Sequence, residues 1–215
     1  MGTWSDRAVP RLTDWALRGP DIDALRAEVC TGLTGDVLEV GFGSGLNLRF
    51  LPAAVERVSA VEPADTGWRL SERRREQASV PVQRTGLDGQ VLEEPADRFD
   101  SALVTFSLCT IPDPARALSE IARVLKPGGT LHFLEHGLAP DPGVARWQRR
   151  LEPLQSAVFA GCHLTRDTPA LVRAAGFDVL ELRQEYLPGP RVGRPWAYGS
   201  VGVAAVSSSG TDDTD

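Results

Sequence analysis

A glycine-rich turn that directly follows an apolar strand constrains the fold of this chain more than any other feature of its sequence. Residues 38–45 read Leu-Glu-Val-Gly-Phe-Gly-Ser-Gly, with glycine at every second position from Gly41 to Gly45. Because glycine has no Cβ, such a turn bends tightly and lets a ligand lie against its backbone. We expect a helix over residues 46–51 that points its free N–H groups toward that ligand.

The spacing of these glycines separates two kinds of nucleotide-binding turn. The dinucleotide fingerprint reads G-x-G-x-x-G, and its third glycine would fall at position 46, which is Leu46 here. The third glycine is instead Gly45, and Glu39 stands two residues before the first glycine. The spacing therefore disfavours an NAD-dependent oxidoreductase, which we keep as an alternative of a different class.

Strand and helix signals alternate from residue 36 to about residue 206. Strands are expected at residues 37–40, 58–61, 80–83, 99–108, 130–135, 177–186 and 198–206. Helices are expected at residues 21–32, with Asp21 as N-cap, and at 46–51, 71–77, 114–125, 144–158 and 168–175. This alternation predicts an α/β fold with a doubly wound, mostly parallel sheet that binds ligands at the carboxyl ends of its strands. The last two strands lack a clear helix between them, which predicts an antiparallel edge strand.

The overall composition is ordinary for a folded globular protein. The 215 residues are 42% hydrophobic and carry a formal net charge of −6, so no general basic field is present to hold nucleic acid. No apolar run approaches the ~18 residues that cross a bilayer, and the first twelve residues do not resemble a signal peptide. We expect a cytoplasmic protein without an integral membrane segment and without a nucleic-acid partner.

The cysteines indicate the cellular compartment, and the absence of a change in composition along the chain indicates the domain organisation. Three widely spaced cysteines without a C-x-x-C pair fit a reducing cytoplasm and indicate neither disulfides nor a metal site. We expect a single domain over residues 1–206, which begins with a helical segment at residues 1–35. Residues 207–215 are small, polar and acidic, and they predict a disordered tail. The choice between monomer and homodimer is left open.

The E-x-G-x-G-x-G form of residues 39–45 resembles motif I of the class I S-adenosylmethionine-dependent methyltransferases. Further matches stand where predicted strands end, and the element order is similar to that family's seven-stranded, Rossmann-like fold. An acidic residue at Glu62 can accept both hydrogen bonds of a ribose diol, whereas Asp88 before Gly89 also fits plain turn chemistry. The resemblance implies that S-adenosyl-L-methionine, which leaves as S-adenosyl-L-homocysteine, is bound by Glu39, Gly41, Gly43, Gly45, Glu62, Pro63, Leu87, Asp88, Ser107 and Leu108.

Three downstream segments are candidates for the pocket of the methyl acceptor. His136 ends the fifth predicted strand, where it could act as a base, orient the acceptor, or simply bond to backbone. Residues 160–168 form a compact polar cluster in which His163 is a second candidate catalytic residue and Cys162 is interpreted as structural. With the helix at 144–158, this cluster belongs to an expected substrate-covering insert over residues 137–170.

A closer resemblance rests on three motifs. Leu108-Cys109, Glu135-His136 and Gly-Cys-His-Leu-Thr-Arg-Asp-Thr at residues 161–168 are similar to the methyltransferase-like family that includes microsomal alkyl-thiol S-methyltransferases. The resemblance implies a small-molecule acceptor, with a thiol as the leading expectation. Animal members of that family begin with a hydrophobic membrane segment, which the first twelve residues here do not show. An O- or N-methyltransferase for a natural-product, quinone or phospholipid acceptor and a non-catalytic cofactor-binding protein stay as alternatives.

Overall fold

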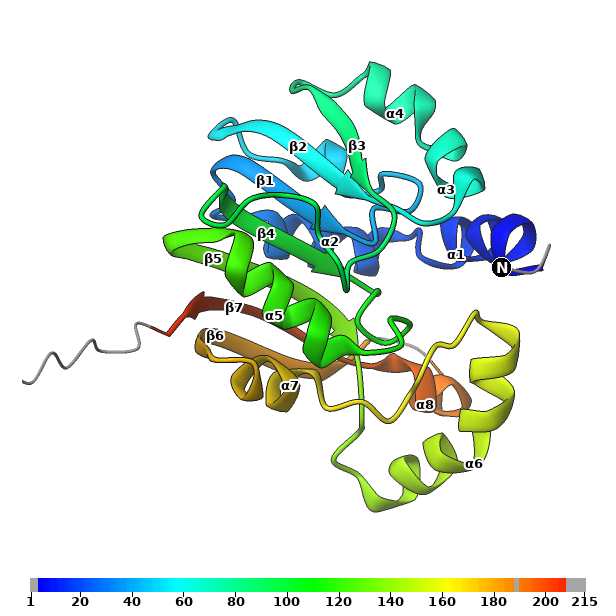
Figure 1. Cartoon of the computed structure of the whole chain (residues 1–215). Helices are drawn as coiled ribbons and strands as arrows, with labels where there is room; N and C mark the ends of the chain where they lie inside the picture. Colours follow the sequence, from blue (N-terminus) through cyan, green and yellow to red (C-terminus); the bar gives the residue numbers. More distant parts are fainter. Residues whose placement is uncertain (1–3, 188–189, 208–215) are drawn as a thin grey trace, which may run out of the picture.

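The computed structural model describes residues 4–187 and 190–207, which are built around a seven-stranded sheet (Figure 1). The strands lie in the order β3-β2-β1-β4-β5-β7-β6. Their bounds are β1 (Gly35–Val40), β2 (Val55–Val61), β3 (Val82–Gly86), β4 (Phe99–Thr105), β5 (Leu125–His136), β6 (Phe177–Tyr186) and β7 (Tyr198–Val206). The predicted α/β class with a mostly parallel sheet of seven strands is confirmed.

The strand directions divide the sheet into a parallel part and an antiparallel side. Every strand pairing among β1, β2, β3, β4 and β5 is parallel, whereas β7 runs antiparallel to both β5 and β6. The predicted antiparallel edge is therefore confirmed as a pair of strands at one side. The strand order reverses between β1 and β4, and such a switch point is where open α/β sheets bind ligands.

Helices cover both faces of the sheet and pack apolar side chains against each face. Their bounds are α1 (Val9–Ala16), α2 (Pro20–Cys30), α3 (Asp65–Leu70), α4 (Glu72–Glu76), α5 (Pro114–Val124), α6 (Pro142–Val158), α7 (Thr168–Ala174) and α8 (Arg194–Ala197), with short turns η1 (Trp4–Ala8), η2 (Leu48–Phe50) and η3 (Arg191–Gly193). Ile121 of α5 and Val172 of α7 pack on one face, and Val29 of α2 packs on the other. Figure 1 shows α5 in front of the sheet and α2 behind it. Burial on both faces explains why the centre of β4 is apolar, with Ala102, Leu103 and Val104 fully buried.

The helix predicted directly after the glycine turn is wrong. Residues 46–51 form only the single 3-10 turn η2. The Asn47 side chain points inward, where its Nδ2 donates to Glu39 Oε1 at 2.8 Å and to Thr105 Oγ1 at 3.0 Å, and Pro52 follows at once. An inward polar side chain and a proline that cannot donate a helical N–H stop the turn from growing. The backbone of the turn itself, and no helix N-terminus, therefore lines the ligand side.

Several predicted boundaries shift for local reasons. Asp21 is not an N-cap, because α2 begins at Pro20, whose fixed φ suits the first helical position, and Gly19 precedes it. The predicted strand at 80–83 begins instead at residue 82, after Pro81. The helix predicted at 71–77 is the shorter α4, and α3 precedes it in a segment where no helix was predicted. The fourth strand ends at Thr105 rather than at residue 108, because Phe106 adopts a positive φ of 52°.

No helix within the described ranges is long and apolar enough to cross a bilayer. The tail predicted at 207–215 lies, from residue 208 onward, outside the described residues.

Candidate active site

A cavity of about 970 Å³ opens at the carboxyl ends of the parallel strands, above the switch point between β1 and β4. Its volume lies at the upper end of the range of about 300–1,000 Å³ for small-molecule pockets. The predicted site residues that line it are Gly41, Gly43, Glu62, Pro63, Leu87, Asp88, Ser107 and His136. The predicted residues that do not line it are Glu39, Gly45, Leu108 and His163.

The three glycines of the turn are required for different reasons. All three have positive φ, between +58° and +77°, a conformation that glycine adopts readily. A Cβ on Gly41 would overlap Ser107 Oγ at 1.9 Å, and one on Gly45 would press on the Phe42 ring at 3.1 Å. A Cβ on Gly43 would meet only the Gly41 carbonyl oxygen, at 4.0 Å, and would project into the cavity. Gly43 thus leaves room for a ligand, whereas Gly41 and Gly45 shape the turn.

Glu62 follows β2 and joins the turn to the cavity. Its Oε2 accepts a hydrogen bond from Gly43 N at 2.6 Å, and its Oε1 accepts one from Ala64 N at 2.8 Å. The side chain is buried in the cavity wall, and this burial raises its pKa. Because each carboxylate oxygen has a second lone pair, Glu62 can accept ligand hydroxyls while it holds the turn. The sequence predicted the first of these roles and missed the second.

Leu87 and Asp88 follow β3 at the rim of the cavity. Asp88 Oδ1 accepts hydrogen bonds from Gln90 N and Nε2, both at 2.9 Å, which is the turn chemistry considered as the alternative for this residue. Leu87 is 59% exposed and still lines the cavity. The rim therefore offers an apolar contact surface next to a fixed carboxylate.

Glu39 lies beneath the cavity and acts through its neighbours. It is 1% exposed, and burial raises its pKa to about 7. Asn47 donates to Glu39, and Arg26 in turn donates to Asn47 Oδ1 at 2.6 Å. Both Asn47 and Arg26 line the cavity. Sequence reasoning missed both residues, since a single asparagine in a turn and a single arginine on a helix form no recognisable pattern.

The N-terminal helices close one side of the cavity. Val9 and Thr13 of α1 line it. The Ser44 hydroxyl of the glycine turn donates to Asp14 Oδ1 at 2.5 Å, and Arg74 pairs with the same carboxylate at 3.1 Å. The sequence predicted helix in this region without assigning it a part in the site. The polar ties to Asp14 could not be foreseen, because they join three segments that are distant in sequence.

A buried carboxylate fixes the loop after β4. The two oxygens of Glu135 accept hydrogen bonds from the backbone N–H groups of residues 107–109 at 2.6, 3.0 and 3.4 Å. Burial raises the pKa of Glu135, and the backbone bonds act against that rise. From the opposite side, Arg166 donates to the carbonyl oxygens of Leu108 and Ile111. The Leu108 side chain itself is fully buried in the core, so the loop is clamped from two sides.

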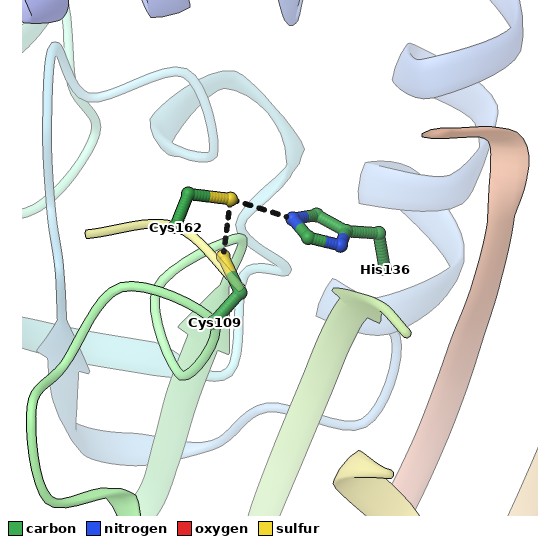
Figure 2. A group of neighbouring side chains, drawn as sticks. All are labelled: Cys109, His136 and Cys162. Atoms are coloured by element: carbon green, nitrogen blue, oxygen red, sulfur yellow. Dashed lines mark hydrogen bonds between the residues drawn. The ribbon is translucent and has the colours of Figure 1, made fainter. Parts of the chain in front are cut away.

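Two thiols and an imidazole meet at the far end of the cavity, as Figure 2 shows. Cys162 Sγ lies 3.1 Å from His136 Nε2, and the Cys162 thiol donates to Cys109 Sγ at 3.6 Å. All three residues line the cavity. The bond with the Cys109 thiol, together with burial, raises the pKa of Cys162, so Cys162 is a poor nucleophile at neutral pH. Sequence reasoning found His136 but not the convergence of the two thiols on it.

His163 does not reach the cavity. Its Nδ1 lies 2.8 Å from Glu152 Oε1, and the other oxygen of Glu152 accepts from Leu164 N at 2.8 Å. The side chain of His163 is 40% exposed. The imidazole therefore ties the 161–168 segment to α6, and the structure does not bring it together with His136 at the site.

Comparison with known proteins identifies the family. Residues 38–133 match the family model of a methyltransferase domain. The chain is 35% identical over 158 residues to thiol S-methyltransferase TMT1B of Rattus norvegicus, covering 72% of this chain and 64% of that protein. It is 32% identical over 168 residues to thiol S-methyltransferase TMT1A of Homo sapiens, covering 76% and 68%. The chain belongs to the class I S-adenosylmethionine-dependent methyltransferases.

The methyltransferase fold extends over almost the whole chain. A solved structure from Thermotoga maritima, described as an S-adenosylmethionine-dependent methyltransferase and possible histamine N-methyltransferase, covers 96% of this chain with a TM-score of 0.67 and 22% identity; all of that structure is matched. This likeness concerns the fold alone. The chain spans about two thirds of the length of the thiol S-methyltransferases that it matches.

The residues of this methyltransferase fit the donor that its family uses. S-adenosylmethionine carries a ribose diol, which needs paired acceptors, and Glu62 offers a buried carboxylate in the cavity wall. The backbone at Gly43 faces open space that any Cβ would fill. Arg26 and Asn47 supply polar groups at the same end. The side chains and backbone at the β1–β3 end of the cavity therefore fit a ligand with hydroxyl, charged and apolar parts.

Proposed function

We propose that this protein transfers the methyl group of S-adenosylmethionine to the sulfur of a small thiol. The supporting observation is the identity of 32–35% with two thiol S-methyltransferases over 72–76% of the chain. The cavity of about 970 Å³ supports this function, because it is large enough for a donor with a small acceptor beside it.

The donor is assigned to the β1–β3 end of the cavity. Three of the predicted donor residues, Glu39, Gly45 and Leu108, do not line the cavity and support the residues that do. The full proposed set is Glu39, Gly41, Gly43, Gly45, Glu62, Pro63, Leu87, Asp88, Ser107 and Leu108. Glu62 accepts the ribose hydroxyls, and Leu87 with Asp88 lies beside the adenine. When bound, S-adenosylmethionine supplies a methyl group on a positively charged sulfur.

The acceptor is assigned to the β4–β5 end, beside His136. Residues 137–170 cover it in this proposal, since Gln155, Phe159 and Ala160 from this segment line the cavity. The nucleophile is a thiolate, and free thiols have a pKa of about 8.5. The protein's task is to hold that sulfur next to the donor and to keep water out. His163, bonded to Glu152, has no part in this assignment.

Calorimetric titration with S-adenosylhomocysteine tests the donor site. We expect binding in the micromolar range, and its absence would contradict the proposal. NAD⁺ binding without S-adenosylhomocysteine binding would favour an oxidoreductase instead.

A panel of alkyl thiols, phenols, amines and phospholipid vesicles tests the acceptor class. We expect methyl thioethers to form, at a rate that rises with pH as the thiolate forms. Activity on phenols, quinols, amines or phospholipid without activity on thiols would favour an O- or N-methyltransferase. Bound S-adenosylhomocysteine with no turnover on the whole panel would indicate a non-catalytic protein.

We further propose a single domain over residues 1–206, in the cytoplasm, as a monomer or homodimer. Cell fractionation with the natural chain tests the location, and light scattering tests the oligomeric state. Recovery in the membrane fraction would contradict a cytoplasmic location.

A further inference from the structure

Three potential metal ligands from distant segments converge at the acceptor end of the cavity. Cys109 follows β4, His136 ends β5, and Cys162 lies between α6 and α7. Figure 2 shows the two sulfur atoms and the imidazole directed at one another. One potential ligand atom from each side chain lies within 4.8 Å of the others. Among the described residues, this cluster has the composition and spacing that could hold a metal ion. Thiolate and imidazole together suit Zn²⁺.

Two of the three spacings in the cluster are close to those of a tetrahedral zinc site. With Zn–S bonds of about 2.3 Å and Zn–N bonds of about 2.0–2.1 Å, neighbouring ligand atoms stand about 3.5–3.8 Å apart. The two sulfur atoms are 3.6 Å apart, and Cys162 Sγ is 3.1 Å from His136 Nε2. Small side-chain adjustments would therefore place all three atoms on one ion.

The backbones that carry these ligands are already held in place. Glu135 fixes the N–H groups of residues 107–109, which include Cys109. The Cys109 carbonyl oxygen accepts from the backbone N–H next to Cys162, that of His163, at 2.8 Å. His136 ends a strand whose register pairs it with Gly199. Such preorganisation is what a metal site requires of its scaffold.

The cluster leaves one side open to the acceptor pocket. All three residues line the large cavity rather than being enclosed by protein. Structural zinc sites have four protein ligands, whereas catalytic sites have three and keep one position for water or substrate. Two cysteines and one histidine form a donor set of the second kind.

We propose that Cys109, His136 and Cys162 bind Zn²⁺ and that its open position takes the acceptor thiol as a thiolate; the second part rests on the proposed thiol methylation. The two cysteine thiolates balance the charge of the ion. A third thiolate, from the acceptor, makes the site negative where it faces the positive donor. His136 is then a ligand rather than a base.

The reaction balances without an oxidant or reductant. The acceptor thiol releases its proton to solvent as its sulfur binds the ion. An electron pair of that sulfur forms the new bond to the methyl carbon. The bond between this carbon and the donor sulfur breaks, its electron pair stays on the donor sulfur, and the positive charge there disappears. The neutral thioether is a weaker ligand than the thiolate and leaves.

Metal titration of the reduced, full-length protein tests the site without any activity measurement. Zn²⁺ is measured by stoichiometry and chelator competition, and Co²⁺ by the thiolate charge-transfer band and the visible bands of tetrahedral cobalt. We expect one ion per chain and tetrahedral cobalt spectra for the natural protein. Cys109→Ser and Cys162→Ser should each bind Zn²⁺ at least about 100-fold more weakly.

Cys30→Ala is the matched control, because Cys30 is a buried cysteine that packs among α2 and the sheet, outside the cluster. It should keep the metal affinity and the cobalt bands of the natural protein. If Cys162→Ser proves unfolded by circular dichroism, His136→Gln decides in its place. An octahedral cobalt spectrum of the natural protein, or equal Zn²⁺ affinity of the folded variants, would overturn the site.

Removal of the metal then tests the role of the ion in methyl transfer. After chelation we expect thiol methylation to fall at least about 10-fold and to return with Zn²⁺, while S-adenosylhomocysteine affinity stays unchanged. Full thiol methylation by metal-free protein would overturn the acceptor role. If no thiol is methylated in any metal state, the proposed function fails, and the cobalt spectrum still decides whether the metal site exists.

Discussion

At the β1–β3 end of the cavity the backbone of consecutive residues forms part of the wall, whereas at the β4–β5 end side chains from three separate segments meet. The turn at residues 41–45 is joined to the end of β2 by backbone hydrogen bonds from Gly41 and Phe42 to Val61 and by the bond from Gly43 N to Glu62. Cys109 and Cys162, which meet at the other end, are 53 residues apart. A backbone wall restricts residues through size and φ, and a side-chain wall restricts them through chemistry. In the proposed function, the first end holds the methyl donor, and the second end can vary with the acceptor.

The largest expected effect comes from a substitution in the glycine turn, which blocks one end of the cavity and leaves the other unchanged. Gly43→Val places a branched side chain where the ligand lies and in a backbone conformation that valine avoids. We expect S-adenosylhomocysteine binding, measured by calorimetry, to be abolished. Gly43→Ala, which is less strained, should weaken it strongly.

Gly143→Val serves as the control for Gly43, because a Cβ at this position in the first turn of α6 meets no atom within 4 Å. It should bind S-adenosylhomocysteine like the natural protein. Normal donor affinity in a folded Gly43→Val protein would show that the ligand does not approach this backbone.

The next effect acts at the other end alone. His136→Ala should leave S-adenosylhomocysteine affinity within about twofold and lower thiol methylation about 100-fold, the size expected when the acceptor is no longer held at the reacting position. His163→Ala is the matched comparison, since this imidazole bonds to Glu152 away from the cavity. Unchanged turnover of folded His136→Ala would remove His136 from the site.

A smaller effect is expected from the carboxylate that joins strand and turn. Glu62→Gln keeps the shape of the side chain and loses a charge-assisted hydrogen bond, so we expect about 10-fold weaker S-adenosylhomocysteine binding. Asp65→Asn changes an exposed carboxylate that pairs with Arg84 nearby and should alter binding by less than twofold. If both variants lost the same S-adenosylhomocysteine affinity, the loss would come from the change in net charge rather than from a contact between Glu62 and the ligand.

The last effect concerns the stability of the fold and its pH dependence, and changes no contact with the ligand. Burial raises the pKa of Glu39 from 4.5 to about 7, so the folded state holds this proton more tightly than the unfolded state. The free energy of unfolding therefore falls as pH rises from about 4.5 to about 7, by up to about 3 kcal/mol, and levels off above. Glu39→Gln lacks this dependence. In urea unfolding it should gain stability relative to the natural protein between pH 5 and pH 8, and parallel profiles would contradict a buried, protonated Glu39.

Prediction from the sequence succeeded where one segment carries its own signal. The expected α5, α6 and α7 and the strands at 177–186 and 198–206 match the structure within a few residues, since apolar periodicity and Pro or Gly at the ends are local properties. It failed at residues 46–51, where the inward bonds of Asn47 to Glu39 and Thr105 override a helical pattern. The predicted end of β4 was wrong for a similar reason, because Glu135 of another strand binds the backbone beyond residue 106.

The sequence by itself determined the family resemblance, the sheet and the glycine turn that lines the cavity, because a glycine turn after a buried strand encodes its geometry in adjacent residues. Only the tertiary structure decided that Arg26, Asn47 and α1 line the same cavity as the glycine turn and that His163 stays outside it. It also decided that two thiols meet His136, although their spacing in the sequence indicated no metal site. The physical reason is that side chains from distant segments become neighbours only when the sheet register and the packing of its loops place their backbones together.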